Sequence, residues 1–352
     1  MIVVDGSLGE GGGQILRSSL TLSAVLGRPV AIVNIRAQRP RPGLGNQHLA
    51  AAQATAQICK GELQGAKKGS RELVFRPGKV RAGSYAFDIG TAGSTTLVLQ
   101  TILPALAFSA DGPSTVTIRG GTHNPMAPPA DYISECYLPA LEIMGLTASC
   151  ELVTHGFYPK GGGLVRAEIE PRRKQAEPLP PLDLTAELDW GEPEVEILIT
   201  NLPMHIAELE QNVAAKELGL DPAAVKIEPL DGKVGPGNAI MVRYRSGGRT
   251  ALFTSFGQKG KRAEWVALEA ALEARVFSAR KTAVDYHLAD QLLLPMALGP
   301  GGSFVTSSIT AHTRTQCDLL EIFLGIEVEV KKLREGAWKV TVPMAAVRSS
   351  PR

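Results

Sequence analysis

The sequence predicts a mixed α/β (α+β) fold, in which repeated β-α units form a large core domain that a smaller α/β insert domain interrupts. Three observations lead to this prediction. Short apolar segments of strand length alternate with longer segments whose apolar residues recur at helical spacing. Glycine clusters recur beside these segments, which favours similar turns in repeated units. The pattern also changes after a charged, proline-rich stretch and returns to its first style near residue 282.

The first half of the chain alternates strand-like and helical segments. The helix at 130–144 is the clearest, because Ile133, Tyr137, Leu141 and Met144 recur at helical spacing. The predicted strands are residues 1–4, 30–35, 72–76, 84–89, 114–119, 148–153 and 163–170, and the predicted helices are residues 13–26, 47–59, 92–108 and 130–144.

A linker at residues 171–174 and 177–182 leads into the second half. There we predict strands at 195–200, 239–245, 250–256, 303–308, 327–332 and 337–342, and helices at 204–218 and 261–279. Residues 292–298 and 317–324 form two further apolar runs. The simplest organisation has three parts: residues 1–184 as the first part of the core domain, 185–275 as the insert domain, and 276–352 as the second part of the core domain.

Composition narrows the class of protein. The chain has 352 residues, of which 44% are hydrophobic and only 5% aromatic, so the core should be aliphatic. Its net charge is +2, so any contact with a polyanion must come from a local cluster of cations. We expect no membrane contact, because no window reaches the roughly 18 apolar residues of a spanning helix, and the N-terminus is typical of a first strand rather than a signal peptide. Four scattered cysteines indicate reduced thiols in a cytoplasmic protein without a zinc site.

One glycine-rich stretch is unusual enough to identify a family. Residues 155–165 read HGFYPKGGGLV, and glycine lets backbone approach backbone or ligand closely. This stretch resembles the signature of the RNA 3′-terminal phosphate cyclase family, in its catalytic, ATP-dependent branch. Further blocks are similar in sequence and order, and the resemblance runs from about residue 3 to about residue 345. These blocks are residues 5–17 (DGSLGEGGGQILR), 36–48 (RAQRPRPGLGNQH), 90–100 (GTAGSTTLVLQ), 120–131 (GGTHNPMAPPAD) and 287–291 (HLADQ).

His312 is the main candidate for catalysis. By composition alone, a single histidine in a polar segment is usually a surface or capping residue. About three quarters of an ordinary histidine is neutral at pH 7, and neutral imidazole can attack phosphorus and form a covalent intermediate. The resemblance implies that His312 is the histidine that becomes adenylylated.

The resemblance also implies an ATP site. It places adenine-nucleotide contacts on Gln100, Pro128, His287, Leu288, Ala289, Asp290 and Gln291. From the residues alone, 287–291 would be the capped start of a buried helix and Gln100 a solvated helix residue. No GKS/T motif is present, which excludes a P-loop NTPase. Glu10 lies on a glycine loop, where one carboxylate could help to hold Mg²⁺ (or Mn²⁺) that is bound mainly to phosphates, although a solvated turn acid is the simpler interpretation.

Cations cluster after the second predicted strand. Arg36 and Arg39 are interleaved with prolines in an extended loop, and arginine binds phosphate with a planar fork. The resemblance implies that Arg17, Arg36, Arg39 and Gln47 contact the phosphate of an RNA end. The remaining histidines, His48, His123, His155 and His205, have no spacing that indicates a shared site, and we interpret them as structural.

Taken together, the predicted activity is ATP-dependent conversion of an RNA 3′-terminal phosphate to a 2′,3′-cyclic phosphate. It would proceed through a histidinyl-AMP and an RNA-adenylate, and the partners would be ATP and RNA with a 3′-phosphate. Two alternatives stay open: an adenylyltransferase of other polynucleotide ends, and a non-catalytic ribosome-assembly relative, which should lack the nucleophilic histidine. The sequence leaves the physiological RNA, the preferred metal and a homo-oligomeric state undecided.

Overall fold

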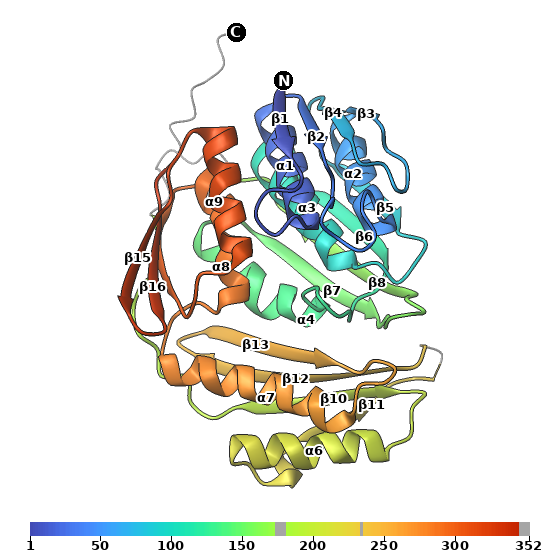
Figure 1. The fold of residues 1–352 in the computed structure, drawn as a ribbon, viewed down its shortest axis with the longest axis vertical. Helices are drawn as coiled ribbons and strands as arrows, with labels where there is room; N and C mark the ends of the chain where they lie inside the picture. Colours follow the sequence, from blue (N-terminus) through green and yellow to red (C-terminus); the bar gives the residue numbers. More distant parts are fainter. Residues whose placement is uncertain (173–180, 233–234, 345–352) are drawn as a thin grey trace.

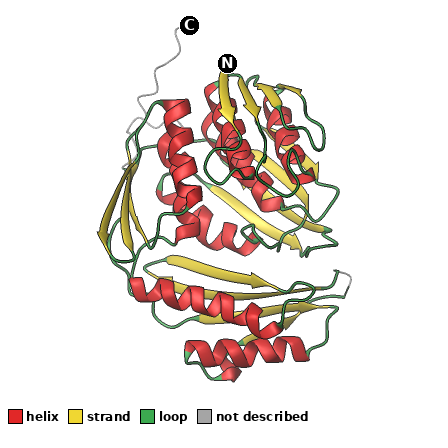
Figure 2. Cartoon of the chain, viewed as in Figure 1, coloured by secondary structure: helices red, strands yellow, loops and turns green. Residues whose placement is uncertain are grey.

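Three four-stranded sheets share one order of strands and helices, and this repeat runs through the core (Figure 1). The computed structural model describes residues 1–172, 181–232 and 235–344. In each repeat a helix joins two parallel strands, a second helix follows, and an antiparallel hairpin completes the sheet. The predicted mixed α/β class is confirmed, with helices packed against sheets as Figure 2 shows.

The first repeat begins with β1 and continues with α1, which has the predicted bounds. Its sheet has the order β1-β2-β4-β3. Strand β3 was not predicted, because three residues are too few to show an alternating pattern. The elements are β1 (Ile2–Asp5), α1 (Gly13–Leu26), β2 (Val30–Val33), α2 (Asn46–Cys59), β3 (Glu62–Gln64) and β4 (Leu73–Arg76).

The second repeat contains a single π-helical turn inside the helix predicted at 130–144. Pro139 lies just after this turn. Proline has no N–H to donate and collides with the carbonyl group four residues earlier, so a wider turn at that point relieves the clash. The elements are β5 (Gly83–Asp88), α3 (Thr95–Ser109), β6 (Ser114–Gly120), α4 (Ala130–Tyr132), η1 (Ile133–Tyr137), α5 (Leu138–Ile143), β7 (Ala148–Thr154) and β8 (Gly163–Ile169).

The third repeat is split in the sequence. Strand β9 was not predicted, because we assigned its first residue to the linker, of which residues 173–180 lie outside the described residues. β9 pairs in parallel with β14, about 120 residues further along the chain. The elements are β9 (Leu182–Leu184), α8 (Tyr286–Leu298), β14 (Gly302–Thr306), α9 (Ala311–Leu324), β15 (Glu329–Arg334) and β16 (Ala337–Val342).

A fourth sheet, with the order β11-β10-β12-β13, lies between β9 and α8 in the sequence. The two ends of this segment meet, since the N–H of Leu188 donates to the carbonyl of Lys281 and the Trp190 indole donates to the carbonyl of Thr282. The proposed division after residue 275 lies inside α7, and the domain boundaries stay a prediction. The elements are β10 (Glu194–Thr200), α6 (His205–Leu218), η2 (Pro222–Ala224), β11 (Lys226–Pro229), β12 (Gly237–Ser246), β13 (Arg249–Phe256) and α7 (Ala263–Arg280).

The two faces of this fourth sheet pack against different partners. Along β12, Ile240 and Val242 belong to a core that α6 and α7 cover, whereas Ala239 and Met241 belong to the larger core of the three repeats. Successive side chains of a strand point to opposite faces, so the ten residues of β12 serve both cores.

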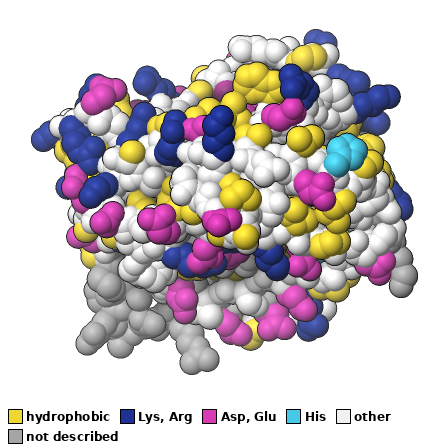
Figure 3. Space-filling model, turned by 90° about the horizontal axis from the view of Figure 1, so that it is seen from below, with side chains coloured by type: hydrophobic (Ala, Val, Ile, Leu, Met, Phe, Trp, Pro, Cys, Tyr) yellow, Lys and Arg dark blue, Asp and Glu magenta, His cyan; other side chains and the backbone are white. Residues whose placement is uncertain are grey.

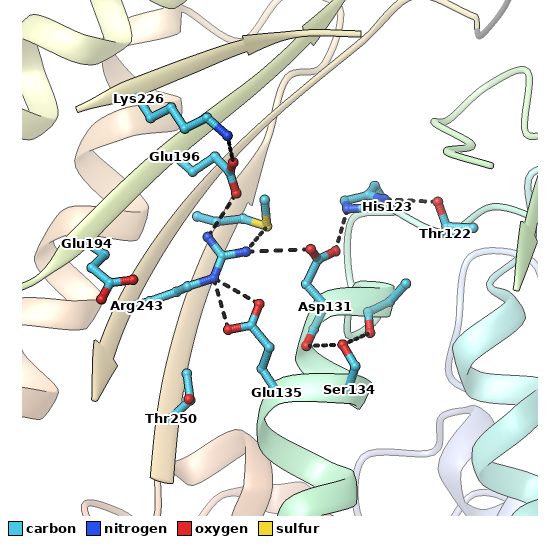
Figure 4. A network of polar contacts seen from close by, with 12 residues as sticks. Thr122, His123, Asp131, Ser134, Glu135, Glu194, Glu196, Lys226, Arg243 and Thr250 are labelled. Carbon is cyan, nitrogen blue, oxygen red and sulfur yellow. Dashed lines mark hydrogen bonds and ion pairs between the residues drawn. The ribbon is translucent and has the colours of Figure 1, made fainter. Parts of the chain in front are cut away.

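A network of ion pairs reinforces this junction (Figure 4). Arg243 on β12 is only 7% exposed. Its guanidinium group lies 3.0 Å from Glu135 on η1, 3.1 Å from Glu196 on β10 and 3.5 Å from Asp131 on α4. The Asp131 carboxylate is also 2.9 Å from the buried His123 imidazole, so the network reaches from the fourth sheet into the second repeat.

The glycine-rich signature at 155–165 lies at the same junction. Gly161 and Gly162 have positive φ angles of 68° and 80°, and a Cβ on Gly161 would lie 2.8 Å from the backbone of Ala92. Phe157 packs against Gly237 at the start of β12, and the His155 ring lies 5.2 Å from the His123 ring. The predicted close approach of backbone to backbone therefore occurs between Gly161 and Ala92, within the second repeat, and the Phe157 side chain makes the contact with the fourth sheet.

Candidate active site

A pocket of about 450 Å³, counted with the solvent at its mouth, opens where α1, α3, α8 and α9 meet. Figure 1 shows α8 and α9 beside α1 and α3, so segments from both ends of the chain form this pocket. Its lining residues are Gln14, Arg17, Ser18, Thr21, Gln100, Pro104, Tyr137, Asp290, Gln291, Leu294, Pro295 and Gln316.

His312 lies beside this pocket, in the first turn of α9. Thr310 caps the helix and accepts a hydrogen bond from the N–H of Thr313, which fixes the start of the turn that carries His312. The His312 side chain is 46% exposed, and its Nε2 lies 3.1 Å from a carboxylate oxygen of Glu10. Burial lowers the pKa of His312 below its ordinary value, Glu10 raises it, and Arg17 and Arg39 lower it further. The imidazole is therefore mainly neutral at pH 7, and its contact with Glu10 is an ion pair only in the protonated form.

Gln14, which we did not single out in the sequence, orients this imidazole. Its Oε1 accepts a hydrogen bond of 2.8 Å from Nδ1 of His312, and its Nε2 donates one of 2.8 Å to Asp290. A carboxylate accepts hydrogen bonds, so Asp290 fixes the amide with its oxygen toward His312. A proton is thus held on Nδ1, and Nε2 is the nitrogen that can offer a lone pair. The signal was present in the sequence, since Gln14 lies one helical turn before Arg17 on α1.

Asp290 and Arg17 both line the pocket, and each shifts the pKa of the other. Burial raises the pKa of Asp290 to about 7, against the lowering effect of the charges on His287 and Arg17. Burial likewise lowers the pKa of Arg17 to about 10, against the raising effect of Asp290 and Glu10. Arg17 stays charged at neutral pH, whereas Asp290 titrates there. Groups with strongly shifted pKa values in one pocket are typical of functional sites.

We expect Asp290→Asn to change how stability depends on pH. The folded protein holds the Asp290 proton up to about pH 7, whereas the unfolded chain loses it near its ordinary pKa of 3.8. Asp290 therefore makes stability fall as pH rises between these values. Urea denaturation from pH 4.5 to 7.5 should show the variant gaining stability relative to the wild type across this window. Parallel profiles for the two proteins would contradict the raised pKa.

Glu10 lies between two glycines whose conformation places it. Gly9 and Gly11 have φ of +52° and +59°, and a Cβ on Gly9 would lie 2.0 Å from the Thr315 hydroxyl on α9. The Glu10 carboxylate pairs with Arg39 at 2.8 Å and faces His312. Within the described ranges no cluster of three or more acidic, histidine or cysteine side chains is arranged to hold a metal ion. One carboxylate fits Mg²⁺ that takes its other ligands from phosphates and water.

Two of the predicted nucleotide contacts meet at the pocket with Asp290. Nε2 of Gln100 on α3 donates to Oε1 of Gln291 on α8. His287 lies at the first turn of α8, where its Nε2 contacts the Glu273 carboxylate of α7 at 2.7 Å. The first contact joins helices 191 positions apart in the sequence, whereas the second joins the consecutive helices α7 and α8.

Pro128, Leu288 and Ala289, like His287, are not among the residues that line this pocket. The side chains of Leu288 and Ala289 are 6% and 0% exposed and belong to the hydrophobic core. The carbonyl of Pro128 accepts a hydrogen bond from the Thr96 hydroxyl. The role of these three residues in nucleotide binding stays a prediction.

Two of the predicted phosphate contacts, Arg17 and Arg36, lie close to His48. A Cβ on Gly13 would lie 2.3 Å from His48 and 2.9 Å from Arg17, so the absent side chain lets both approach the start of α1. Burial, followed by the charges of Arg17 and Arg36, lowers the pKa of His48 to about 3. His48 is therefore neutral and accepts a hydrogen bond from the N–H of Gly45, which agrees with a structural role.

Arg36 and Gln47 complete this cluster. Arg36 donates to the carbonyl of Gly43 through one nitrogen, and no other partner of its guanidinium group is found among the described residues. Oε1 of Gln47 accepts a hydrogen bond of 3.0 Å from the N–H of Ser94, which leaves its amide N–H groups as donors. The cluster of donors and positive charges next to His312 suits a phosphate group.

Comparison with known proteins gives a consistent result. A family model described as "RNA 3′-terminal phosphate cyclase" matches residues 8–330. The chain is 47% identical over 335 residues to a protein of that name from Koribacter versatilis, covering 94% of this chain and 92% of the relative. Proteins of the same name from Ectopseudomonas mendocina and Salmonella agona are each 44% identical, over 339 and 335 residues, with 95–97% of every chain covered.

Proposed function

This chain belongs to the RNA 3′-terminal phosphate cyclase family, and from that premise we propose that it converts the 3′-terminal phosphate of RNA into a 2′,3′-cyclic phosphate with ATP as co-substrate. The observation that carries the proposal is the setting of His312. Gln14 holds a proton on its Nδ1, its Nε2 faces Glu10, and arginines that suit phosphate surround it.

The proposed reaction has three steps. Nε2 of His312 attacks the α-phosphorus of ATP, so that an N–P bond forms and pyrophosphate leaves. An oxygen of the RNA 3′-phosphate then attacks the same phosphorus and releases the imidazole, which gives an RNA-adenylate. Finally the 2′-hydroxyl loses its proton and attacks the 3′-phosphorus, which closes the cyclic phosphate and expels AMP. Adenylylation makes chemical sense, because a phosphate monoester dianion is a poor electrophile and AMP is a good leaving group.

Binding and charge stabilisation fall to the residues around His312. Asp290, Gln291 and Gln100 line the side of the pocket where the nucleotide would lie. Arg17, Arg36, Arg39 and Gln47 would hold the RNA phosphate, and positive charges there offset the negative charge that develops in transfer. A Mg²⁺ or Mn²⁺ ion near Glu10 would supply further charge neutralisation on the ATP phosphates.

The test of this function follows one label through both half-reactions. The protein is incubated with α-labelled ATP and then with 3′-phosphorylated RNA. We expect an acid-labile, base-stable protein label that RNA releases as AMP, and an RNA end that resists phosphatase. Accumulation of an RNA-adenylate without cyclisation would favour the end-adenylyltransferase alternative. Absence of any protein label would favour the non-catalytic relative.

We propose a cytoplasmic location, which the state of the cysteines supports. All four are free, with Cys59 and Cys136 buried. Among the described helices, none combines the length and hydropathy that a membrane-spanning segment needs. Free thiols support a reducing compartment, and we place the protein in the cytoplasm.

Glu10→Ala should slow adenylylation of His312 by at least about tenfold, a much larger effect than its effect on RNA binding, because the carboxylate acts through the metal on ATP. Glu10 raises the pKa of His312, so its removal increases the neutral fraction of the imidazole, and a slower step cannot come from protonation. The rate of label uptake is measured against Mn²⁺ concentration, and partial rescue is expected at high Mn²⁺. Uptake at the wild-type rate in low metal would make Glu10 a structural turn residue.

Arg36→Lys should weaken recognition of the RNA 3′-phosphate by about 1.5–3 kcal/mol, a factor of roughly 10 to 150. Lysine keeps the charge but lacks the planar fork. Arg39 is less suitable for this test, because its ion pair with Glu10 links it to the adenylylation step. Binding of 3′-phosphate and 3′-hydroxyl RNA of one sequence is compared in both proteins. If the wild type and the variant preferred the 3′-phosphate RNA to the same degree, Arg36 would not belong to the phosphate site.

A further inference from the structure

Two loops of the first repeat are joined backbone to backbone beside the candidate site. The loop at 36–45 links β2 to α2, and the loop at 65–72 links β3 to β4. Leu44 exchanges hydrogen bonds with the second loop: its N–H donates to Ser70 and its carbonyl accepts from Gly69. A Cβ on Gly43 would lie 2.3 Å from the carbonyl oxygen of Gly69, so only glycine permits this contact. The loops therefore form one continuous surface.

Four exposed cations lie on this surface: Arg41, Lys67, Lys68 and Arg71. Within the described residues, none of them forms an ion pair with a carboxylate. At its inner end the same surface reaches Arg36 and Arg39, and Arg39 contacts Glu10 next to His312. We call the four exposed cations the outer cationic track.

The outer cationic track differs from other parts of the surface. On the described face seen in Figure 3, from the side of the fourth sheet, acidic and basic side chains are interspersed. On the track, residues 64–72 contain three cations and one acid. Since the whole chain has a net charge of only +2, an unpaired local cluster is the feature that can attract a polyanion.

We propose that the outer cationic track binds the phosphodiester backbone of the RNA strand upstream of its 3′-phosphate. This inference rests on the proposed function, which places the terminal phosphate at Arg36 and Arg39. A strand whose end is held there continues outward, and the joined loops offer cations directly beyond that end. Contacts of this kind are independent of base sequence and depend on salt, because each neutralised phosphate releases counterions.

The track predicts a dependence on RNA length. Binding of a labelled 3′-phosphorylated 12-mer and of a 3′-phosphorylated dinucleotide is measured at several salt concentrations. For Lys67→Ala/Lys68→Ala we expect at least tenfold weaker binding of the 12-mer at low salt, with the dinucleotide unaffected. The slope of log K against log[salt] for the 12-mer should become shallower by about 1.4, at about 0.7 per contact for a single strand.

A matched variant controls for overall charge. Lys331 and Lys339 are cross-strand partners on β15 and β16, at the other side of the molecule from β3 and β4 (Figure 1). Lys331→Ala/Lys339→Ala removes the same charge and should leave the slope unchanged. Equal effects of the two double variants, or an unchanged slope in the track variant, would overturn the proposal.

A separate measurement, label uptake and formation of the cyclic end, tests the proposed function. Label uptake from α-labelled ATP needs no RNA, so it should be the same in the wild type and both double variants. If the wild type takes up no label or forms no cyclic end, the proposed function is wrong. The RNA-binding comparison still tests the outer cationic track in that case. If the wild type cyclises RNA but the track variant binds and cyclises the 12-mer normally, the track alone is wrong.

Discussion

His312→Asn is expected to reduce uptake of label from α-labelled ATP to background, the largest loss of activity that any single change should cause. Asparagine can occupy this position in the first turn of α9, but it has no nucleophilic ring nitrogen to form the phosphoramidate. The measurement is protein-bound label after acid and after base treatment. Acid should remove the wild-type label and base should retain it, as a phosphoramidate requires and an acyl phosphate does not.

His205→Asn is the matched control. His205 is an exposed histidine at the start of α6, outside the pocket. This variant should take up label at the wild-type rate. The thermal transition of His312→Asn should lie near that of the wild type, because the side chain is half exposed and no core contact is lost. Label on a folded His312→Asn protein would assign the nucleophile to another residue.

Arg243→Leu is expected to cause the largest loss of stability, about 3 kcal/mol. Leucine fills part of the volume but leaves Asp131, Glu135 and Glu196 facing one another at a junction where each is only 21–24% exposed. The loss should lie at the lower end of the range for broken buried pairs. His123, Arg245 and Lys226 still contact one carboxylate each. Urea denaturation followed by circular dichroism measures the difference.

Arg245→Leu provides the comparison on the same strand. The Arg245 side chain is 50% exposed and pairs with Glu135 and Glu194 near the surface. Exposed pairs contribute little, so this change should cost less than about 1 kcal/mol. If the two variants lost similar amounts, burial of Arg243 would not be what gives the network its strength.

The sequence predicts most of this fold because its strong elements carry complete local signals. Helix α1 has its predicted bounds, since Gly12 precedes it and Gly27 ends it in a left-handed conformation. The strands that were not predicted have only three or four residues, too few to show an alternating pattern. β9 has three residues and is a strand only because β14 lies beside it. Such pairing is invisible in a local pattern.

The candidate site shows the same limit. Motif resemblance singled out His312, Glu10 and Asp290. In the structure Gln14 contacts His312 and Asp290, and Glu10 contacts His312. What the sequence did not provide was the contact geometry: Gln14 linking His312 to Asp290, and Glu273 of α7 reaching His287. These contacts join residues 14 or more positions apart, so no periodicity connects them. Leu288 and Ala289 show a second limit. Both belong to the matched motif, but the motif does not indicate that their side chains are buried in the core.

The meeting of Leu188 with Lys281 and of Trp190 with Thr282 has a consequence for the order in which the chain folds. The first two repeats form from consecutive sequence, but β9 must wait for β14. Closing a flexible loop of about 100 residues costs roughly 2 kcal/mol more than closing one of about 10. Once the intervening segment has folded, its ends are already together, and the third repeat closes over what is in effect a short connection. We therefore expect the intervening segment to acquire protection from hydrogen exchange before β9 and β14 do, and the pocket, which needs α8 and α9, to form last.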